Sequence, residues 1–485
     1  MLQRLLFILF VFSAVLFTSI FGQENSINSD SIKAPGIELL DTVKNKSSLS
    51  VSEIIILGNK ITRERIVLRE IPFSLGDTIE KGMLSTNLIR ARQNLLNTGL
   101  FNFVTIVPEI DGDLLKVRID LIERWYTWPI PIVELAETNF NTWWLTRDFK
   151  RVNYGLYVER GNFRGRKETL RFKVQTGYTN QYAVQYSIPY LNQKQTLGME
   201  ATLSYFQNHE IAYKTIENKR VFFSEPGSVA REEFYAKLML TYRGRIYNSN
   251  SVYLKYNAAF IDDSLTIISD DYFTDNLTET RFFTLSYKFK RDRRDFKPYA
   301  LKGYYFDIEA VKIGNSMLPG SEDVVFFTGA LKKFWKISDV FYFAASGKSK
   351  FSITDNQPYY VQRGLGYYDE QVRGYEYYVI DGQSWAMART NIKYQLVKPV
   401  VKNFDFIKSK KFSAFHYAIY LNLFADAGYV QDKLYFQHNP LSNQALFGYG
   451  LGLDWVTYYD QVLRLEYSFN KLGERGFFIN FAAAL

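Results

Sequence analysis

The chain has 485 residues, more than one ordinary domain needs, and it has no cysteine, which excludes disulfides, a lipid-anchored N-terminal cysteine and cysteine metal ligands. No run of about 18 apolar residues follows the first 25 positions, which excludes membrane-spanning helices there. The net charge of +9 is spread along the sequence instead of being clustered, so nothing favours nucleic-acid binding.

The N-terminal residues 1–22 have the pattern of a secretory signal peptide. Arg4 supplies a positive charge, an apolar stretch follows it, and Gly22 marks a cleavage point. Residues 23–50 are rich in Ser, Asn, Asp and Lys, which predicts a flexible linker. The chain is therefore expected to be exported.

Residues 51–124 have the pattern of a small α+β domain. The predicted elements are a strand at 51–57, a helix from Thr62 to Ile71, a helix from Lys81 to Thr98, and strands at 101–108 and 114–122. Thr62 is expected to cap the first helix and Pro72 to end it. The order β-α-α-β-β packs two helices on a small sheet.

This segment resembles a POTRA domain, the periplasmic module of BamA-type and two-partner-secretion transporters. The resemblance is carried by Ile56-Leu57-Gly58-Asn59, by the helix at 87–97, and by Leu96-Asn97-Thr98-Gly99-Leu100-Phe101 entering a strand. It covers the whole segment, and a single copy is found. The resemblance implies a periplasmic domain with a strand edge that binds an extended polypeptide by β-augmentation.

Residues 125–485 alternate between polar and apolar positions without useful helical periodicity. A transmembrane barrel produces this pattern, and the 17% aromatic content of the whole chain with its mean hydropathy of −0.19 agrees with that. A secreted globular β-protein is the alternative. Sixteen strands are predicted, at 127–135, 151–159, 168–177, 181–189, 196–206, 232–243, 250–261, 281–290, 303–312, 323–334, 340–350, 384–396, 413–424, 446–456, 461–469 and 475–483. The number is even, as single-chain bacterial barrels require.

The connections and the alternation orient this barrel. Connections after odd-numbered strands are mostly the longer ones, which places them outside the cell and both termini in the periplasm. In the strand at 413–424, Leu421 and Leu423 should face lipid, whereas His416 and Asn422 should face the lumen. The fold class is thus an α+β POTRA domain followed by an all-β, 16-stranded antiparallel transmembrane barrel at 125–485.

Two motifs, in the longest outer loop and at the end of the thirteenth strand, carry a second resemblance. They are Val372-Arg373-Gly374-Tyr375 and Phe424-Ala425-Asp426-Ala427-Gly428. Both are similar to motifs of the BamA/TamA-type assembly and two-partner-secretion transporter superfamily. The resemblance implies that the loop folds into the lumen and that Arg373 meets the wall. Strand parity places Asp426 on the lumen face, and a guanidinium fork suits a carboxylate.

The barrel must close between its first and last strands. Pro129 and Pro131 remove two backbone donors from one edge of the first strand, which weakens that edge. The alternative is that the prolines form only a stiff approach from the POTRA domain. On the last strand, Gly476 and Phe481 belong to a pattern that approximates the C-terminal signal of barrel clients.

The resemblance implies a protein of the Gram-negative outer membrane that assists insertion, assembly or translocation of polypeptides. Its expected partners are unfolded outer-membrane or secreted polypeptides and outer-membrane lipids, with room for accessory periplasmic or lipoprotein subunits. We expect no enzymatic activity, no cofactor, no metal and no nucleic acid. A passive diffusion pore is the stronger alternative. An outer-membrane hydrolase is the weaker one, because only His416 of the three histidines should face the lumen and no catalytic motif accompanies it.

Overall fold

A computed structural model describes residues 48–135, 149–314, 322–367, 369–403, 414–457 and 461–481, together with 147 and 318. The expected signal peptide and most of the expected linker lie outside these residues. The linker prediction extends slightly too far, because its last three residues already belong to a strand. Among the described residues, no helix is long and apolar enough to cross a membrane.

The N-terminal domain has the predicted helices and strands with one addition. Its elements are β1 (Ser48–Leu57), α2 (Glu64–Leu68), β2 (Thr78–Glu80), α3 (Lys81–Leu96), β3 (Phe101–Asp111) and β4 (Leu114–Glu123). The sheet order is β2-β1-β4-β3, with β1 parallel to β4. Helix α3 buries Leu84, Leu88 and Leu95 in the core beneath it. The three-residue strand β2 is too short for alternation to reveal it.

The prediction that Thr62 caps the first helix is wrong. Helix α2 begins at Glu64, and its N-cap residue makes no side-chain cap. Thr62 Oγ1 instead donates to Glu123 Oε1 at 2.7 Å and accepts from Asn162 Nδ2 at 2.8 Å. Asn162 belongs to the large sheet, so the hydroxyl of Thr62 joins the two domains instead of capping a helix.

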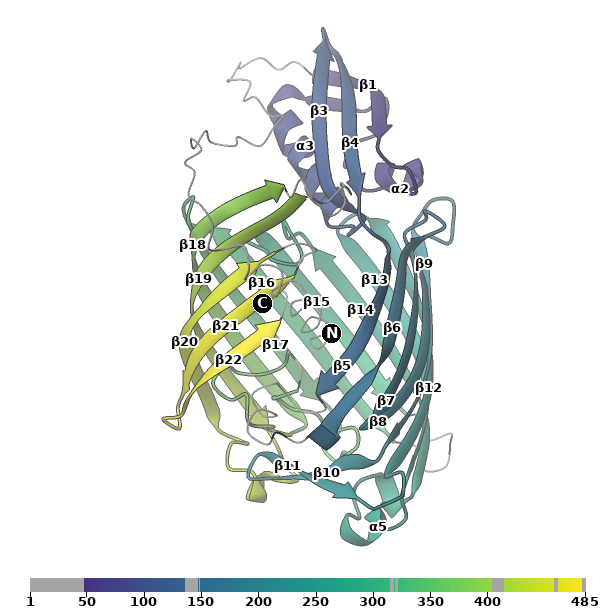
Figure 1. Ribbon diagram of the computed structural model, residues 1–485, viewed down its shortest axis with the longest axis vertical. Helices are drawn as coiled ribbons and strands as arrows, with labels where there is room; N and C mark the ends of the chain where they lie inside the picture. The colour runs from purple at the N-terminus through teal and green to yellow at the C-terminus, as the bar shows by residue number, and fades with distance from the viewer. Residues whose placement is uncertain are drawn as a thin grey trace.

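The large sheet contains sixteen antiparallel strands in sequence order and curls into a barrel (Figure 1), which confirms the predicted fold class. Its strands are β5 (Thr127–Leu135), β6 (Val152–Phe163), β7 (Glu168–Gly177), β8 (Thr179–Ile188), β9 (Leu197–Asn208), β12 (Arg231–Arg245), β13 (Asn248–Ile261), β14 (Glu279–Asp292), β15 (Gly303–Ile313), β16 (Val324–Lys336), β17 (Phe341–Ser352), β18 (Ser384–Asn403), β19 (Ala414–Gln431), β20 (Ala445–Val456), β21 (Val462–Asn470) and β22 (Arg475–Phe481). The hairpin of β10 (Glu210–Ile216) and β11 (Lys219–Ser224) and the short helix α5 (Leu265–Ile268) lie in connecting segments.

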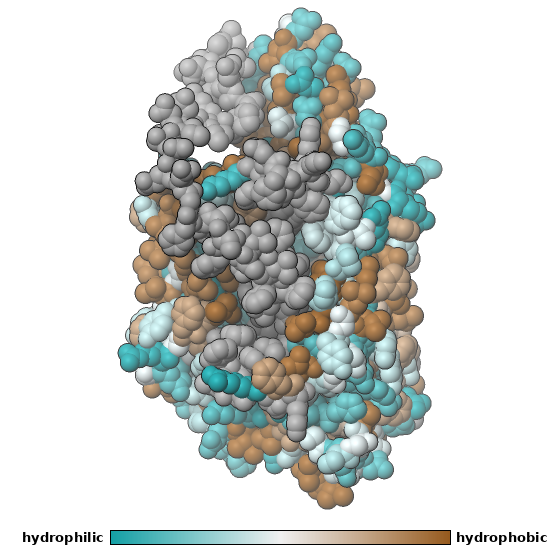
Figure 2. Space-filling view, in the orientation of Figure 1, coloured by the Kyte–Doolittle hydropathy of each residue, from teal (hydrophilic) through white to brown (hydrophobic). Residues whose placement is uncertain are grey.

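Side-chain burial alternates along the barrel strands as the sequence predicts. On β19, Tyr420, Asn422 and Asp426 are buried toward the lumen, whereas Leu421 and Leu423 are exposed on the outer face. In the space-filling view, hydrophobic residues gather on the outer wall at mid-height, with more hydrophilic residues above and below them (Figure 2). The polar faces therefore line the interior of the barrel.

The hairpin of β18 and β19 is longer than the sequence predicts. The sequence ends the twelfth strand at residue 396, but β18 continues to Asn403 and pairs with β19 down to Ala414. The register shifts between Gln395 and Val397 and again between Val397 and Val400, the interval that contains Pro399. A proline cannot donate to a ladder, so the strand passes it through irregular pairing instead of ending.

The POTRA domain docks on turns of the barrel. Arg243, at the end of β12, donates from Nη1 to Glu70 Oε1 at 2.6 Å and from Nη2 to Glu70 Oε2 at 2.7 Å. The hydroxyl of Tyr190 donates to the same carboxylate at 2.7 Å. Farther along the rim, Asn97 Nδ2 donates to the carbonyl of Asp295 at 3.0 Å. Several separate turns thus hold the domain at one end of the barrel (Figure 1).

Candidate functional site

The segment between β17 and β18 packs its tip against the inner wall of the barrel. Val372 and Tyr375, both 2% exposed, join an apolar cluster with wall residues. The other buried members of this cluster are Leu365, Ile380, Trp385, Val430, Leu441 and Leu446. The loop is therefore held by apolar packing on both sides of Arg373.

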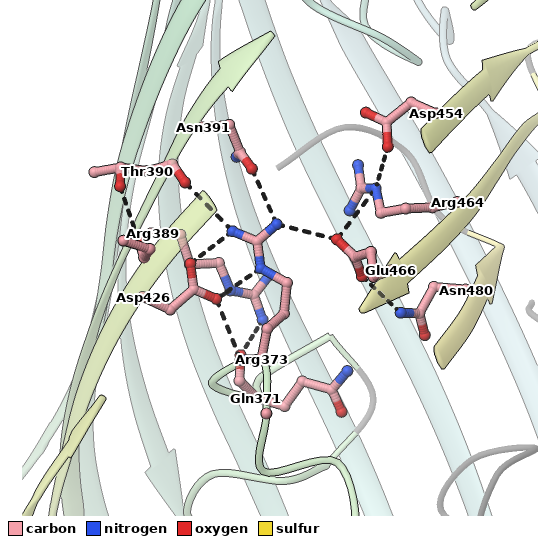
Figure 3. Close-up of polar contacts among 12 residues, drawn as sticks. Gln371, Arg373, Arg389, Thr390, Asn391, Asp426, Asp454, Arg464, Glu466 and Asn480 are labelled. Carbon is pink, nitrogen blue, oxygen red and sulfur yellow. Dashed lines mark hydrogen bonds and ion pairs between the residues drawn. The ribbon is translucent and has the colours of Figure 1, made fainter. Parts of the chain in front are cut away.

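Arg373 reaches Asp426 with the paired geometry that the motifs suggest (Figure 3). Nη2 donates to Asp426 Oδ1 at 2.6 Å and Nε donates to Oδ2 at 2.8 Å. The backbone N–H of Arg373 donates to the same carboxylate at 3.2 Å. Arg373 is 3% exposed and Asp426 4% exposed, so the pair is shielded from water. A shielded bidentate pair is strong where its remaining donors are also satisfied.

Two further wall residues complete the guanidinium's bonding, and the sequence did not identify them as its partners. Arg373 Nη1 donates to Asn391 Oδ1 at 2.9 Å and to Glu466 Oε1 at 3.1 Å. The Glu466 carboxylate also accepts from Asn480 Nδ2 on the last strand at 2.9 Å. Parity alone put Asn391 and Glu466 on the lumen face; no local pattern indicates which of several polar lumen residues a loop arginine will meet.

Neighbouring charges balance around this anchor. Three guanidinium groups face three carboxylates, and these are Arg373, Arg389 and Arg464 with Asp426, Asp454 and Glu466. Arg464 Nε donates to Asp454 Oδ1 at 3.0 Å, and Tyr299 donates to Asp454 Oδ2 at 2.8 Å. Balanced charge lowers the cost of burying the network, because each ion has an opposite partner in a region of low dielectric.

The glycines and the phenylalanine of the motifs make room for close contact. The Phe424 ring centroid lies 3.8 Å from the Arg373 guanidinium carbon, a cation–π contact. A Cβ on Gly428 would lie 2.5 Å from Val372 Cγ2, so only glycine leaves space for the loop there. Gly374 has φ +95°, a conformation that favours glycine, and a Cβ on it would lie 2.8 Å from the carbonyl oxygen of Phe469.

The loop also touches the last strand. The rings of Tyr377 and Phe478 lie with centroids 5.4 Å apart, and the Tyr378 hydroxyl donates to Glu474 Oε1 at 2.7 Å. The loop therefore contacts the final hairpin as well as β18 and β19. A movement of β22 would therefore change these contacts with the loop.

The two end strands of the large sheet have unpaired outer edges within the described part of the chain. The N–H of Gly161 on β6 bonds to the carbonyl of Tyr126, which is in the same register as the β5–β6 ladder. Backbone groups of alternate residues point to opposite sides of a strand. The backbone groups of even-numbered residues of β5 thus point to β6. Those of Pro129 and Pro131 point to the open edge, where a proline offers no N–H donor.

The facing edge belongs to β22. The N–H of Asn470 donates to the carbonyl of Glu474, so even-numbered residues of β22 face β21. Gly476 pairs with Ser468 on β21, and Phe481 is opposite Leu463 at the end of the same ladder. The odd-numbered residues therefore direct their peptide groups at the open edge. The structure brings the predicted loop and wall residues together. Of the predicted seam residues, Pro129, Pro131 and Phe481 lie with their backbone groups at edges that no ladder joins among the described residues, whereas Gly476 pairs with β21.

A POTRA domain fused to a sixteen-stranded barrel, with an inward loop tied to the wall by an arginine, defines a class of outer-membrane barrel. Residues 162–471 match the Omp85 superfamily domain, and residues 49–124 match a POTRA domain described as the surface antigen variable number repeat. The first match covers more than half of the chain, so the protein belongs to the Omp85 superfamily. This membership places it in the outer-membrane class that assembles or transports polypeptides.

Solved structures align with this chain at low sequence identity. CdiB from Escherichia coli aligns with a TM-score of 0.54 and 12% identity over 90% of this chain and 76% of its own. BamA from Haemophilus ducreyi lacking POTRA domains 1–3 aligns with a TM-score of 0.48 and 14% identity over 89% and 84%, respectively. CdiB from Acinetobacter baumannii gives 0.46 and 14% over 89% and 73%. No curated protein matches the chain.

Proposed function

We propose that this protein passes polypeptide clients into or across the outer membrane through a seam between β5 and β22. Its POTRA domain would lie in the periplasm and receive the client first. The observation that carries this proposal is the pair of unjoined strand edges, one of which lacks donors at Pro129 and Pro131. Unfolded outer-membrane or secreted polypeptides are the proposed partners.

The missing donors weaken any pairing across the seam. The open edge of β5 presents carbonyls throughout but loses two N–H groups in its middle. Each lost bond removes roughly 0.5–1.5 kcal/mol of net stabilisation. The seven-residue β22 offers only a short row of groups to begin with. A client strand that supplies its own donors could pair with β22 at little cost to the barrel.

The POTRA sheet provides a second edge for an extended client. Strand β3 is the outermost strand in the order β2-β1-β4-β3, and it is 11 residues long. Its final residues, Glu109 to Asp111, are exposed. An extended polypeptide can add a strand to such an edge through main-chain bonds with little demand on sequence. This tolerance suits a protein that handles more than one client.

A passive diffusion pore fits the interior less well. The described residues of the loop, 353–367 and 369–383, pack into the lumen through an apolar cluster and a buried ion-pair network. An open pore has no need to order so long a segment inside itself, since the ordering costs conformational entropy. We therefore keep polypeptide handling as the proposed function.

The test uses a photo-crosslinking amino acid at two edges and two matched controls. Phe477, on the open edge of β22, is compared with Leu451, which is similarly exposed to lipid on the doubly paired strand β20. Glu109, on the edge of β3, is compared with the exposed Arg90 on helix α3. Polypeptide adducts are identified by mass spectrometry after crosslinking in cells.

We expect unfolded outer-membrane or secreted polypeptides at Phe477 and Glu109, and none at the two control positions. Adducts at Glu109 without adducts at Phe477 would leave the POTRA role standing and remove the seam. Equal adducts at Leu451 and Phe477, or polypeptide adducts at neither edge, would contradict the proposed function.

A further inference from the structure

A cavity of about 280 Å³ lies where the POTRA domain meets the end of the barrel. Five cationic side chains line it, and these are Lys167, Arg243, Lys290, Arg294 and Lys297. They come from two barrel turns, β6–β7 and β14–β15, and from the lumen faces of β12 and β14. The residues of the two motifs and of the seam do not line this cavity, so it is a separate feature of the fold.

Three carboxylates also line the cavity, and two of them are already occupied. Glu70 receives both terminal nitrogens of Arg243, at 2.6 and 2.7 Å. Asp292 receives Nε and Nη2 of Arg294, at 2.9 and 2.8 Å. Glu200 is the third carboxylate. Five cations against three carboxylates leave the lining with an excess of positive charge.

The excess is concentrated on lysines. Within the described part of the chain, neither Lys290 nor Lys297 has a carboxylate within ion-pair distance of its ammonium group. Lys167 Nζ is 3.9 Å from Glu70 Oε1, an oxygen that Arg243 and Tyr190 already occupy. Lys290 and Lys297 are exposed at the cavity, whereas Lys167 is partly buried. Cations that line one cavity repel one another to the extent that water does not screen them, and a bound anion would offset that repulsion.

The pKa of Lys167 reflects burial and the neighbouring cations. Desolvation in the cavity lowers the pKa of Lys167 to about 8, Glu70 opposes the shift, and Arg243 and Lys297 add to the lowering. The group therefore lacks a fully compensating anion. An anion placed among the lysines would raise this pKa toward its usual value.

The free donors suit phosphate better than carboxylate. A carboxylate is best met by a planar guanidinium fork, and both arginines of the lining are engaged with Glu70 and Asp292. The remaining cations are ammonium groups on flexible stems, which meet the several oxygens of a phosphate as point charges. The volume is at the lower end of ligand pockets and fits a small headgroup, not a folded segment.

We propose that this junction cavity binds a phosphate group, free in the periplasm or carried by a lipid headgroup, through Lys167, Lys290 and Lys297. The site bridges the POTRA domain and the barrel, since Glu70 belongs to the first and the lysines to the second. Its occupation would offset the repulsion among the lysines, while Arg243 keeps its separate ion pair with Glu70.

The test uses the purified full-length protein and two probes. The first arm measures binding of radiolabelled orthophosphate by equilibrium dialysis in detergent at low ionic strength. The second arm reconstitutes the protein in phosphatidylglycerol vesicles and measures retained lipid by native mass spectrometry. The variant is the double substitution Lys290→Gln and Lys297→Gln. The control is Lys336→Gln, at the end of β16 outside the cavity, where the lysine pairs with the exposed Asp339.

Saturable binding by the wild type should fall by at least about tenfold in the double variant, because two charge-assisted contacts are lost, and should be unchanged in the control. Lysine-dependent binding in the first arm assigns free phosphate, and in the second arm alone it assigns a lipid headgroup. Equal binding by wild type and double variant, or binding of neither probe, would overturn the proposal. Lysine-dependent capture of a polyglutamate peptide without either phosphate probe would also overturn it, in favour of an acidic polypeptide. Heat-modifiable migration on gels checks that every variant is folded.

Discussion

At the scale of single residues, the anchor between the loop and the wall should be a large local contribution to barrel stability. We predict that Asp426→Asn lowers the free energy of unfolding by about 3–5 kcal/mol, because it leaves the Arg373 charge buried without its bidentate partner. Urea unfolding of the reconstituted barrel, followed by heat-modifiable migration, measures this change. In a cycle with Arg373→Met, the double variant should lose less than the sum of the single losses.

A matched control separates burial from charge. Arg281 and Glu279 pair at 3.0 Å on the outer face with both side chains about half exposed. Glu279→Gln removes a similar ion pair but should cost about 1 kcal/mol or less, because water screens it. If the two substitutions cost the same, the buried anchor has no special role in stability.

The sequence predicts some residues of this anchor but not others. Arg373 and Asp426 could be found because each lies in a short motif with a known relation to the other. Glu466 and Asn391 could not, because their only local signal is strand parity, which many lumen residues share. The pairing of a loop residue with one of them is fixed by the path of the whole loop, which the sequence does not express locally.

At the scale of elements, the docking of the POTRA domain should depend on one carboxylate. Burial would raise the pKa of Glu70, but Lys167, Arg243 and Tyr190 outweigh it and hold the pKa well below its usual range. We predict that Glu70→Gln weakens docking by about 2–5 kcal/mol, because Arg243 loses the charge that compensates it. Hydrogen–deuterium exchange of the segment joining β4 to β5 should then rise while the cores of both domains stay protected.

The POTRA domain supplies a control for that substitution. Glu53 and Lys116 form an exposed pair at 3.7 Å on the same domain, away from the barrel. Glu53→Gln should leave exchange at the junction unchanged. Unchanged exchange in Glu70→Gln as well would mean that the other turns hold the domain without this ion pair.

The sequence predicts barrel strands better than the segments between them. Each of the sixteen strands was found because one face meets lipid along its whole length, which imposes a period of two. The hairpin of β10 and β11 is not predicted, because its apolar residues pack against other connecting segments and the end of β13 instead of facing lipid. The continuation of β18 beyond residue 396 was missed because Pro399 reads as a strand end, although register shifts allow the ladder to continue.

At the scale of the whole molecule, the described barrel strands form one continuous ladder whose end strands are β5 and β22. The inward loop contacts the part of the wall that ends at β22. Asn480 on β22 bonds to Glu466, which also bonds to the loop arginine. The edge at β22 is therefore supported from inside, whereas the proline edge of β5 is distant from this network in the ladder order. We infer that, if the seam opens, β5 moves and β22 stays with the loop.

The absence of native cysteine allows a direct test of the seam at the scale of the whole molecule. Val133→Cys on β5 and Phe477→Cys on β22 place two thiols on outward-facing positions of the two open edges. Joining them, by oxidation or by a bifunctional thiol reagent, should stop client assembly, and cleavage of the link should restore it. Assembly is measured as the appearance of folded client barrels or of secreted polypeptide. The control joins Tyr449→Cys and Phe469→Cys, which are direct partners on β20 and β21 with rings 5.3 Å apart, and it should leave assembly unchanged because that ladder is already closed. Full activity with the β5–β22 link quantitatively formed would show that clients do not use the seam, and the inward loop would then have to move for any client to pass.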